Sequence, residues 1–186
     1  MGFQHQLSIT GATGVGTTSL VKALKKRLPG PYPYRWISAG QFMRERADQL
    51  GMTIDQLAKH NRDHPEEGHD RWCDNRVAAF AQTDWLVCES RLSHFFLPKA
   101  FKVLLLCSLD LRAQRRQRDF PHRSLDDVRE EIRVRDDNDN ARYVQIYGED
   151  CLWGREKFDL VLHTSSYTTD WLADELLDVY ELKCHT

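Results

Sequence analysis

The hydrophobic residues of this chain follow two patterns: short continuous runs, and longer segments in which they recur every three or four positions. Continuous runs of this length are typical of strands in a parallel sheet that is covered on both faces. Five such runs predict strands at Leu7–Ile9, Tyr34–Ile37, Trp85–Cys88, Phe101–Cys107 and Phe158–His163.

The segments between these runs have helical periodicity. In the first of them, Leu20, Leu24 and Leu28 recur at four-residue spacing, and a turn at Pro29–Pro33 ends the helix. Alternating strands and helices predict an α/β fold, with three layers (α/β/α), a five-stranded parallel sheet and ligands at the carboxyl ends of the strands. A chain of 186 residues fits one domain over residues 1–186. Further helices are expected at 40–60, 68–82, 108–118, 124–147 and 169–182.

A glycine-rich segment joins the first strand to the first helix. Gly11, Gly16 and Thr18 match the phosphate-binding pattern GxxxxGK[ST], in which the Ser/Thr hydroxyl reaches Mg²⁺. Backbone N–H groups of such a loop surround an anion, and the following helix adds its positive N-terminal end. The sequence therefore predicts a P-loop NTPase fold that binds ATP and Mg²⁺. The candidate ATP-binding residues are Gly11, Ala12, Thr13, Gly14, Val15, Gly16, Thr17, Thr18 and Ser19.

Thr17 occupies the position where the pattern has lysine, so the cation that meets the β- and γ-phosphates is missing. Lys22 does not replace it, because it lies roughly 140° around the helix. Two other interpretations stay open. Thr10–Gly14 resembles the start of a short-chain dehydrogenase site, although the chain has no Tyr-x-x-x-Lys pair and no acidic residue at the end of the second strand. The segment could also be a glycine turn without a ligand.

Polar residues follow the second and third strands at the edge where ligands are expected. Ser38, Gly40 and Arg44 come after the second strand, and Glu89 and Arg91 after the third. The planar guanidinium of arginine suits phosphate binding. The alternative is that both arginines are surface residues at helix starts.

The segment 124–147 predicts a long helix whose N-terminus is capped by Ser124 with Asp127. One face of this helix is apolar, then charged, then apolar again. Charges on an inward face need a partner or a ligand; the alternative is ordinary ion pairing in solvent, worth a few tenths of a kcal/mol per pair. The residues on this face are Leu125, Val128, Ile132, Arg135, Asp139, Arg142 and Ile146.

Arginines also crowd the segment before this helix. We interpret 112–124 as a short helical lid that carries arginine toward a transferring phosphate, where one inserted arginine can be worth about 10³ to 10⁵ in rate. The alternative is that these side chains lie in solvent and bind no ligand. The arginines are Arg112, Arg115, Arg116, Arg118 and Arg123.

Composition narrows the class of partner. The net charge of −2 argues against a general polyanion binder, so we expect small-molecule ligands and no polymeric nucleic acid. No apolar run approaches the length of a membrane span and no signal-peptide pattern is present, so we expect a cytoplasmic monomer with reduced cysteines.

A zinc site could be formed by His60, His64, His69 and Cys73. However, Pro65 and Gly68 interrupt this segment, and we expect no zinc there.

Several segments together resemble one known family. The SAGxxxR, ESRL and RAxRR segments, and above all the run Arg135–Arg142 with the form RDDxDxxR, are similar to those of cytidylate kinases, particularly the compact archaeal-type members. The resemblance extends from Leu7 to Leu176. It implies a nucleoside monophosphate kinase that moves the γ-phosphoryl group of ATP onto CMP or dCMP, with an acceptor-binding region at about 38–82 and the lid at about 112–124.

The resemblance also implies roles for individual residues. Ser38, Gly40, Arg44 and Arg91 match positions that hold the acceptor nucleotide, and Asp139 matches one near its sugar. Glu89 falls where the family has an acidic residue near Mg²⁺ and its waters, so Thr18 and Glu89 are the candidate metal-binding residues. Because Thr17 replaces the loop lysine, a non-catalytic nucleotide-binding protein of the same fold stays open beside the kinase. The remaining expected roles are ATP binding by Arg115 and catalysis by Arg118, Arg135 and Arg142.

Overall fold

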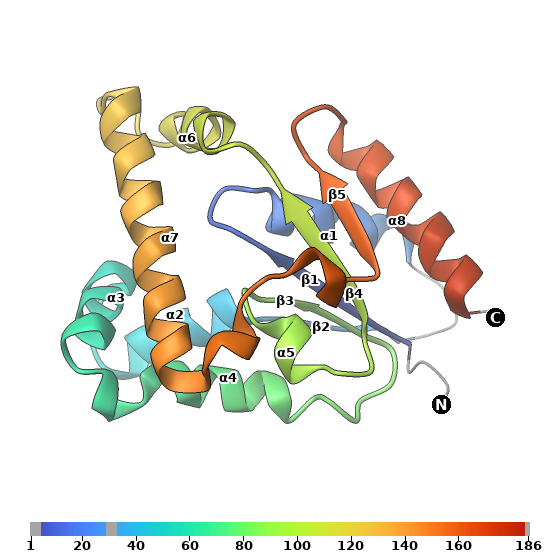
Figure 1. The fold of residues 1–186 in the computed structure, drawn as a ribbon, viewed down its shortest axis with the longest axis horizontal. Coiled ribbons are helices and arrows are strands. Elements are labelled where there is room, and N and C mark those ends of the chain that lie inside the picture. The colour runs from blue at the N-terminus through green and yellow to red at the C-terminus, as the bar shows by residue number, and fades with distance from the viewer. Residues whose placement is uncertain (1–4, 29–32, 185–186) are drawn as a thin grey trace.

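The computed structural model of this chain describes residues 5–28 and 33–184, so all of the predicted turn at Pro29–Pro33 except Pro33 lies outside the described residues. Its centre is a five-stranded sheet in the order β2-β3-β1-β4-β5, and every strand pair is parallel (Figure 1). The predicted sheet is confirmed, with strand ends shifted by one or two residues. The strands are β1 (Gln6–Gly11), β2 (Arg35–Ser38), β3 (Leu86–Glu89), β4 (Phe101–Leu106) and β5 (Leu160–His163).

The strand order excludes the dehydrogenase interpretation. In dinucleotide-binding folds, the first strand lies beside the second. Here β1 lies between β3 and β4, with Ile9 opposite Glu89 and Gly11 opposite Leu105, while β2 is an edge strand. The central position of β1 brings the glycine loop to the middle of the sheet's carboxyl edge, next to the acidic residue that ends β3.

Helices cover both faces of the sheet, which gives the three predicted layers. On one face, α1 and α8 bury Leu20, Leu24 and Leu176 against the strands, and on the other α2, α4 and α5 pack around Phe42 and Val77. The predicted helices are confirmed except where noted below, and α5 is additional. The helices are α1 (Thr17–Arg27), α2 (Ala39–Gln49), α3 (Ile54–Asp63), α4 (His69–Ala78), α5 (Ser93–Phe96), α6 (Leu109–Gln117), α7 (Leu125–Tyr147) and α8 (Thr169–Cys184), with short 3₁₀ turns η1 (Pro65–Glu67), η2 (Glu149–Cys151) and η3 (Arg155–Lys157).

The single helix expected at 40–60 is wrong, because the chain forms α2 and α3 there. Gly51 has φ +67°, which ends the first helix, and Thr53 starts the second with a reciprocal cap: its Oγ1 accepts from Gln56 N (3.2 Å) and its own N–H donates to Gln56 Oε1 (2.7 Å). Leu50, Ile54 and Leu57 keep helical spacing across the break, so periodicity alone does not reveal it.

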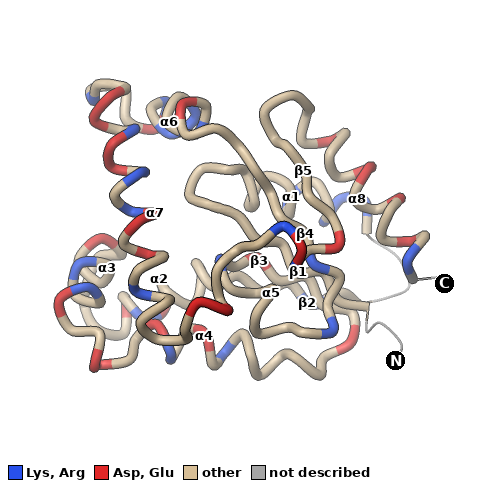
Figure 2. Tube along the Cα trace, viewed as in Figure 1, with Lys and Arg blue, Asp and Glu red and all other residues tan. Residues whose placement is uncertain are grey.

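Helix α7 stands away from the sheet, beside α6 and opposite α3 (Figure 1). It packs on α6 through Ala113, Val128 and Ile132, and its predicted cap is present, since Ser124 Oγ accepts from Asp127 N at 3.0 Å. Figure 2 shows charged residues spread over α3, α6, α7 and α8, whereas the strands are almost free of them. Among the described residues, no helix combines the length and apolar character needed to span a membrane.

Candidate active site

The loop between β1 and α1 has glycine where other residues would not fit. A Cβ on Gly11 would stand 2.5 Å from Val15 Cγ1 and 3.3 Å from the Leu105 carbonyl oxygen. Gly14 and Gly16 have φ of +77° and +105°, in the region that strains other residues. The loop therefore has the compact shape of a phosphate cradle, and it leads directly into the positive end of α1.

Three arginines hold this loop through its oxygens. Arg112 Nη1 donates to the Thr13 carbonyl (3.1 Å), Arg115 Nη1 to the Val15 carbonyl (3.2 Å), and Arg91 Nη2 to Thr13 Oγ1 (2.6 Å). Arg115 also donates to Thr164 Oγ1 and to the Thr164 carbonyl after β5. Arg112 and Arg115 thus support the loop through its carbonyl groups and Arg91 through a hydroxyl group, and ATP binding by Arg115 stays a prediction.

The two residues expected near Mg²⁺ lie together. Thr18 Oγ1 donates to Glu89 Oε2 at 3.2 Å, because the register of β1 and β3 brings the end of β3 beside the first turn of α1. A hydroxyl and a carboxylate oxygen are the hard donors that Mg²⁺ prefers. Thr17 opens α1 and Lys22 is exposed further along it, so the first turn of α1 carries no charged side chain.

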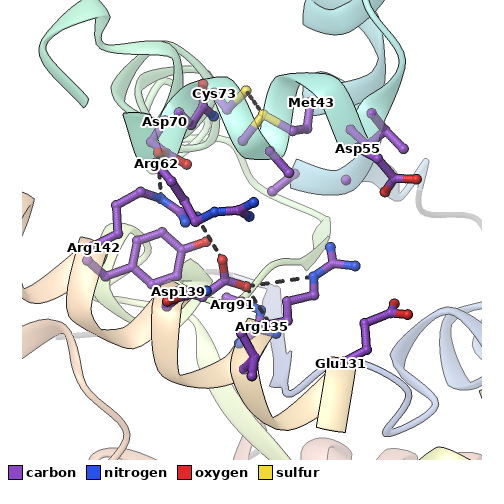
Figure 3. A pocket seen from close by; sticks show the side chains of 18 of the residues that line it. Met43, Asp55, Arg62, Asp70, Cys73, Arg91, Glu131, Arg135, Asp139 and Arg142 are labelled. Atoms are coloured by element: carbon purple, nitrogen blue, oxygen red, sulfur yellow. Dashed lines mark hydrogen bonds and ion pairs between the residues drawn. The ribbon is translucent and has the colours of Figure 1, made fainter. Parts of the chain in front are cut away.

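A cavity of about 580 Å³ separates α2, α3 and α4 from α7 (Figure 3). This volume is in the range of small-molecule binding sites. Of the residues expected after the second strand, only Gly40 lines the cavity. Ser38 and Arg44 lie just behind it: a Cβ added to Gly40 would be 3.5 Å from Ser38 Oγ and 3.6 Å from Arg44 Nη1. The other expected ligand-binding residues in its wall are Arg91, Arg135, Asp139 and Arg142.

The charged part of the α7 face turns toward this cavity. Arg142 Nε lies 2.7 Å from Asp70 Oδ2 on α4, and Arg142 Nη2 donates to Asp139 Oδ1 at 2.9 Å. Asp139 Oδ2 also pairs with Arg91 Nη2 at 3.2 Å. The side chains of Asp139 and Arg142 are 13% and 11% exposed, so ordinary ion pairing in solvent does not describe them. Arg135 is 45% exposed and lies 3.9 Å from Asp139.

Asp136 is a central residue of the site that the sequence reasoning missed. Its carboxylate accepts from Arg91 Nη2 (2.7 Å) and from Arg112 Nη1 (2.6 Å), which ties α7 to α6 and to the end of β3. Its position in the sequence could have indicated this, because Asp136 follows Ile132 by four residues and precedes Asp139 by three, the spacing of neighbours on a helix surface. Asp136 is not part of the cavity wall: it lies on the side of α7 that contacts Arg91 and Arg112, whereas Arg135 lines the cavity.

The arginines of 112–124 have three different environments. Arg112 and Arg115 are part of the loop's support, whereas Arg116 Nη2 pairs with Glu131 Oε1 at 3.1 Å and Arg123 pairs with the other oxygen of Glu131. The Arg116 guanidinium also lies 5.2 Å from the Phe120 ring. Arg118 is exposed and has no ion pair within the described part of the chain, so its catalytic role stays a prediction.

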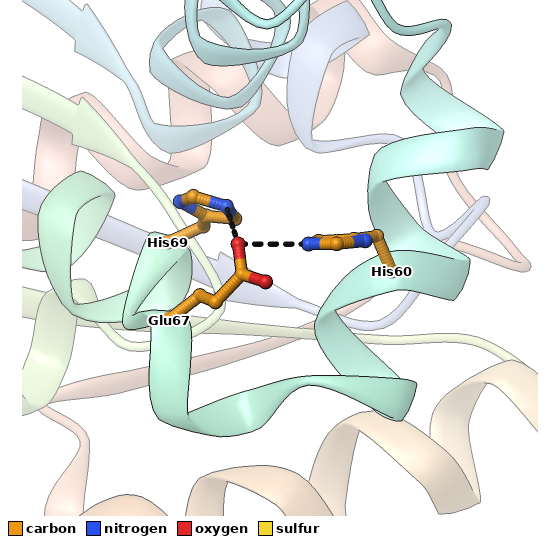
Figure 4. A group of neighbouring side chains, drawn as sticks. All are labelled: His60, Glu67 and His69. Atoms are coloured by element: carbon orange, nitrogen blue, oxygen red, sulfur yellow. Dashed lines mark hydrogen bonds and ion pairs between the residues drawn. The ribbon is translucent and has the colours of Figure 1, made fainter.

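Histidines gather around Glu67 at the outer side of α3 and α4 (Figure 4). Glu67 Oε2 lies 2.9 Å from His60 Nε2 and 3.2 Å from His69 Nε2, while Cys73 donates to Met43 Sδ elsewhere. Arg46 Nε and Nη2 both lie 3.3 Å from His69 Nδ1. A guanidinium only donates, so Nδ1 is the acceptor in these contacts. The atoms of His60, Glu67 and His69 that could bind a metal lie within 4.8 Å of one another, so the expected absence of zinc stays a prediction.

Two buried carboxyl groups lie at the α4 end of the cavity. Burial raises the pKa of Asp74 to about 7, and the hydrogen bond from Tyr147 Oη to Asp74 Oδ2 (2.8 Å) opposes this increase. Burial also raises the pKa of Asp70, against the attraction of Arg142. These two carboxyl groups therefore differ: Asp70 pairs with Arg142, whereas Asp74 has no cation in contact among the described residues.

Known structures share this fold. The shikimate kinase from Acinetobacter baumannii superposes with a TM-score of 0.62 at 15% identity, over 96% of this chain and 94% of that chain. A gluconokinase from Sinorhizobium meliloti 1021 gives 0.59 at 13% identity, over 100% of this chain and 96% of that chain. At such identities the likeness concerns the fold alone, which is that of P-loop kinases.

Sequence comparison is more specific. The cytidylate kinase of Methanothermobacter thermautotrophicus is 32% identical over 168 residues, which cover 88% of this chain and 98% of that protein. The cytidylate kinase of Methanobrevibacter smithii is 29% identical over 173 residues, covering 92% and 95%. The model of the cytidylate kinase-like family matches residues 7–166. The chain thus belongs to the cytidylate kinase-like family, in agreement with the resemblance that its motifs indicate.

Proposed function

We propose that this protein transfers the γ-phosphoryl group of ATP to CMP or dCMP. The observation that carries this proposal is the position of Arg91, whose Nη2 contacts Thr13 of the glycine loop and Asp139 in the cavity wall. One side chain thus joins a phosphate-binding loop to a cavity of nucleotide size. A kinase needs this arrangement, because donor and acceptor phosphates must meet.

The donor side uses the loop from Gly11 to Thr18. Backbone N–H groups and the start of α1 hold the phosphates of ATP, and Arg112 and Arg115 keep the loop in that shape by binding its carbonyl groups. Thr18 and Glu89 are the residues that fit Mg²⁺. When bound, Mg²⁺ supplies charge neutralisation on the β- and γ-phosphates.

The acceptor side uses arginines that are held in place by carboxylates. In the structure both Arg91 and Arg142 form an ion pair with Asp139. A phosphate that enters the cavity therefore meets two oriented guanidinium groups whose positive charge Asp139 neutralises only in part. Asp139 then orients the sugar hydroxyl groups of the acceptor. The turn with Arg118 closes over the transferring phosphate and excludes water, which suppresses hydrolysis of ATP.

A second candidate function rests on Thr17. The first turn of α1 has no charged side chain, and losing one preorganised donor costs about 100- to 1000-fold in rate. A protein that binds nucleotides without transferring phosphate would retain the cavity and the loop. The intact acceptor wall favours the kinase, because a sensor of ATP alone would not need it.

The test is release of ADP from ATP and Mg²⁺ with CMP, dCMP, UMP, AMP and GMP in turn. We expect turnover with CMP or dCMP above the rate with ATP alone. Calorimetry on the same samples separates the alternatives: binding of both nucleotides without ADP release indicates the non-catalytic protein. Binding of neither ATP nor any pyrimidine monophosphate would overturn the proposal.

A further inference from the structure

Trp153 contacts both the main chain and the guanidinium group of Arg91, although the proposed function leaves it without a task. Its indole Nε1 donates to the Arg91 carbonyl oxygen at 2.8 Å, and Arg91 Cζ lies 6.0 Å from the centre of the Trp153 ring. Trp153 is partly buried and is not among the described residues that line the cavity. Its effect on a ligand in the cavity therefore has to pass through Arg91, which does line it.

The segment that carries Trp153 is fixed by contacts of its own. It lies between η2 and η3, after the end of α7. Lys157 Nζ donates to the carbonyl oxygens of Asp150 (2.9 Å) and Leu152 (3.1 Å). The lysine follows Trp153 in the chain and the two carbonyl groups precede it, so these hydrogen bonds tie together the two sides of the segment. The indole therefore has a defined position against Arg91.

The other contacts of Arg91 act on the far end of its side chain. Its Nη2 lies 2.6 Å from Thr13 Oγ1, 2.7 Å from Asp136 Oδ1 and 3.2 Å from Asp139 Oδ2. These oxygens belong to the glycine loop and to α7, whereas the Arg91 main chain lies in the turn between β3 and α5. A long side chain has many rotamers, so a guanidinium keeps one orientation only when its main chain is held as well. The hydrogen bond from Trp153 holds the main chain.

We propose that Trp153 is a positioning residue for Arg91 and holds its guanidinium in the orientation in which it meets the phosphate of the acceptor nucleotide. The indole N–H fixes the Arg91 main chain, and the electron-rich face of the ring attracts the guanidinium and restricts its rotation. Trp153 itself does not touch the nucleotide. This inference rests on the proposed function, because it assumes that the phosphate of CMP or dCMP enters the cavity beside Arg91.

The experiment is a double-mutant cycle on CMP affinity, measured by calorimetry on the full chain. Trp153→Phe keeps an aromatic ring and removes the N–H donor, so CMP binding should weaken by about three- to tenfold, the range expected for one lost hydrogen bond. In the Arg91→Ala background the same substitution should change CMP affinity by less than about twofold, because Trp153 acts through the Arg91 side chain. A merely structural Trp153 would weaken CMP binding equally in both backgrounds.

A control variant and a second measurement support the cycle. Trp36→Phe changes a tryptophan on the edge strand β2, beside Lys25, and should leave CMP affinity within about twofold of the wild type. The second measurement needs no Trp153 variant: fluorine NMR of the protein with its five tryptophans replaced by fluorotryptophan. Arg91→Ala should shift most strongly the signal of the indole beside the guanidinium, and CMP added to the wild type should shift the same signal.

The outcomes are distinct. An equal loss of CMP affinity from Trp153→Phe in both backgrounds, or no loss in either, overturns this inference and leaves the proposed function intact. A wild-type protein that binds neither CMP nor dCMP overturns both. If Trp153→Phe does not fold, or Arg91→Ala binds CMP too weakly for calorimetry, the fluorine spectra decide: CMP-induced shifts confined to signals that Arg91→Ala leaves unchanged contradict the role of Trp153.

Discussion

Arg91 Nη2 lies 2.7 Å from Asp136 Oδ1, so a guanidinium at the end of β3 is held by a carboxylate in the middle of α7. Asp136 also accepts from Arg112, which supports the glycine loop. The side chains of Arg91 and Asp136 are only 14% and 17% exposed. A single carboxylate therefore positions two cations, one that supports the glycine loop and one in the cavity wall.

Replacing this carboxylate tests the arrangement. Asp136→Asn keeps the shape and removes the charge, which leaves two largely buried guanidinium groups without their shared partner. Removing one member of a buried pair costs about 3–5 kcal/mol, so the melting temperature should fall markedly. CMP or inorganic phosphate should stabilise this variant more than the wild type, because an anion replaces the lost charge. The matched control is Asp137→Asn, which loses only the exposed pair with Arg133 and should change stability by less than about 1 kcal/mol.

Arg142 should be required for use of the acceptor. Arg142→Ala removes a charge-assisted phosphate contact and should lower kcat/KM for CMP by at least about tenfold, equal to about 1.4 kcal/mol. The control is Arg133→Ala on the opposite side of α7, where the pairs with Glu130 and Asp137 are exposed; its kcat/KM should be within about twofold of wild type. A near-normal value for Arg142→Ala would mean that its ion pair with Asp70 is only structural.

Thr17 offers a gain-of-function test. Thr17→Lys restores the cation of the phosphate-binding pattern and should tighten ATP binding or raise the transfer rate, with unchanged thermal stability. Thr17→Ala, which adds no cation, should have little effect on either quantity. Loss of a robust wild-type activity in Thr17→Lys would show that this loop binds phosphate in a different way.

His94 should make folding stability depend on pH. Burial, with a smaller effect from Lys102 and Lys157, lowers its pKa from 6.5 to about 4. The unfolded chain therefore binds the proton more readily, so stability falls as pH decreases from about 6.5 to about 4, by up to about 3 kcal/mol. Asp74 acts in the opposite direction: its pKa is raised from 3.8 to about 7, so its contribution is lost as pH increases through that window.

Because the two contributions oppose each other, variants are needed to observe them. Denaturant unfolding from pH 4 to 7 should show that His94→Gln is less sensitive to acid than the wild type. In the same measurement, Asp74→Asn should retain the acid sensitivity and lose the decline toward pH 7. Parallel pH profiles for all three proteins would contradict both assignments.

Local patterns in the sequence were enough to predict the five strands, most of the helices and most of the candidate site. Continuous apolar runs identified the five strands, and the glycine spacing identified the loop, because these patterns reflect local backbone and burial requirements. Spacing along α7 also placed Asp139 and Arg142 on one face, and both line the cavity. Thr18 and Glu89 could be expected together because both follow strands of one parallel sheet.

Local patterns could not predict which elements are neighbours or which charges pair, because both depend on how the chain folds as a whole. The position of β1 between β3 and β4 depends on long-range packing, and no local pattern distinguishes it from the dehydrogenase order. The arginines of α6 look alike in the sequence, yet Arg112 and Arg115 bind the loop while Arg116 binds Glu131, because the direction of each side chain around the helix selects its partner. Asp70 and Asp74 lie on one helix, but only Asp70 pairs with Arg142. The packing of α7 against α4 decides which of the two carboxyl groups Arg142 contacts and how deeply each is buried.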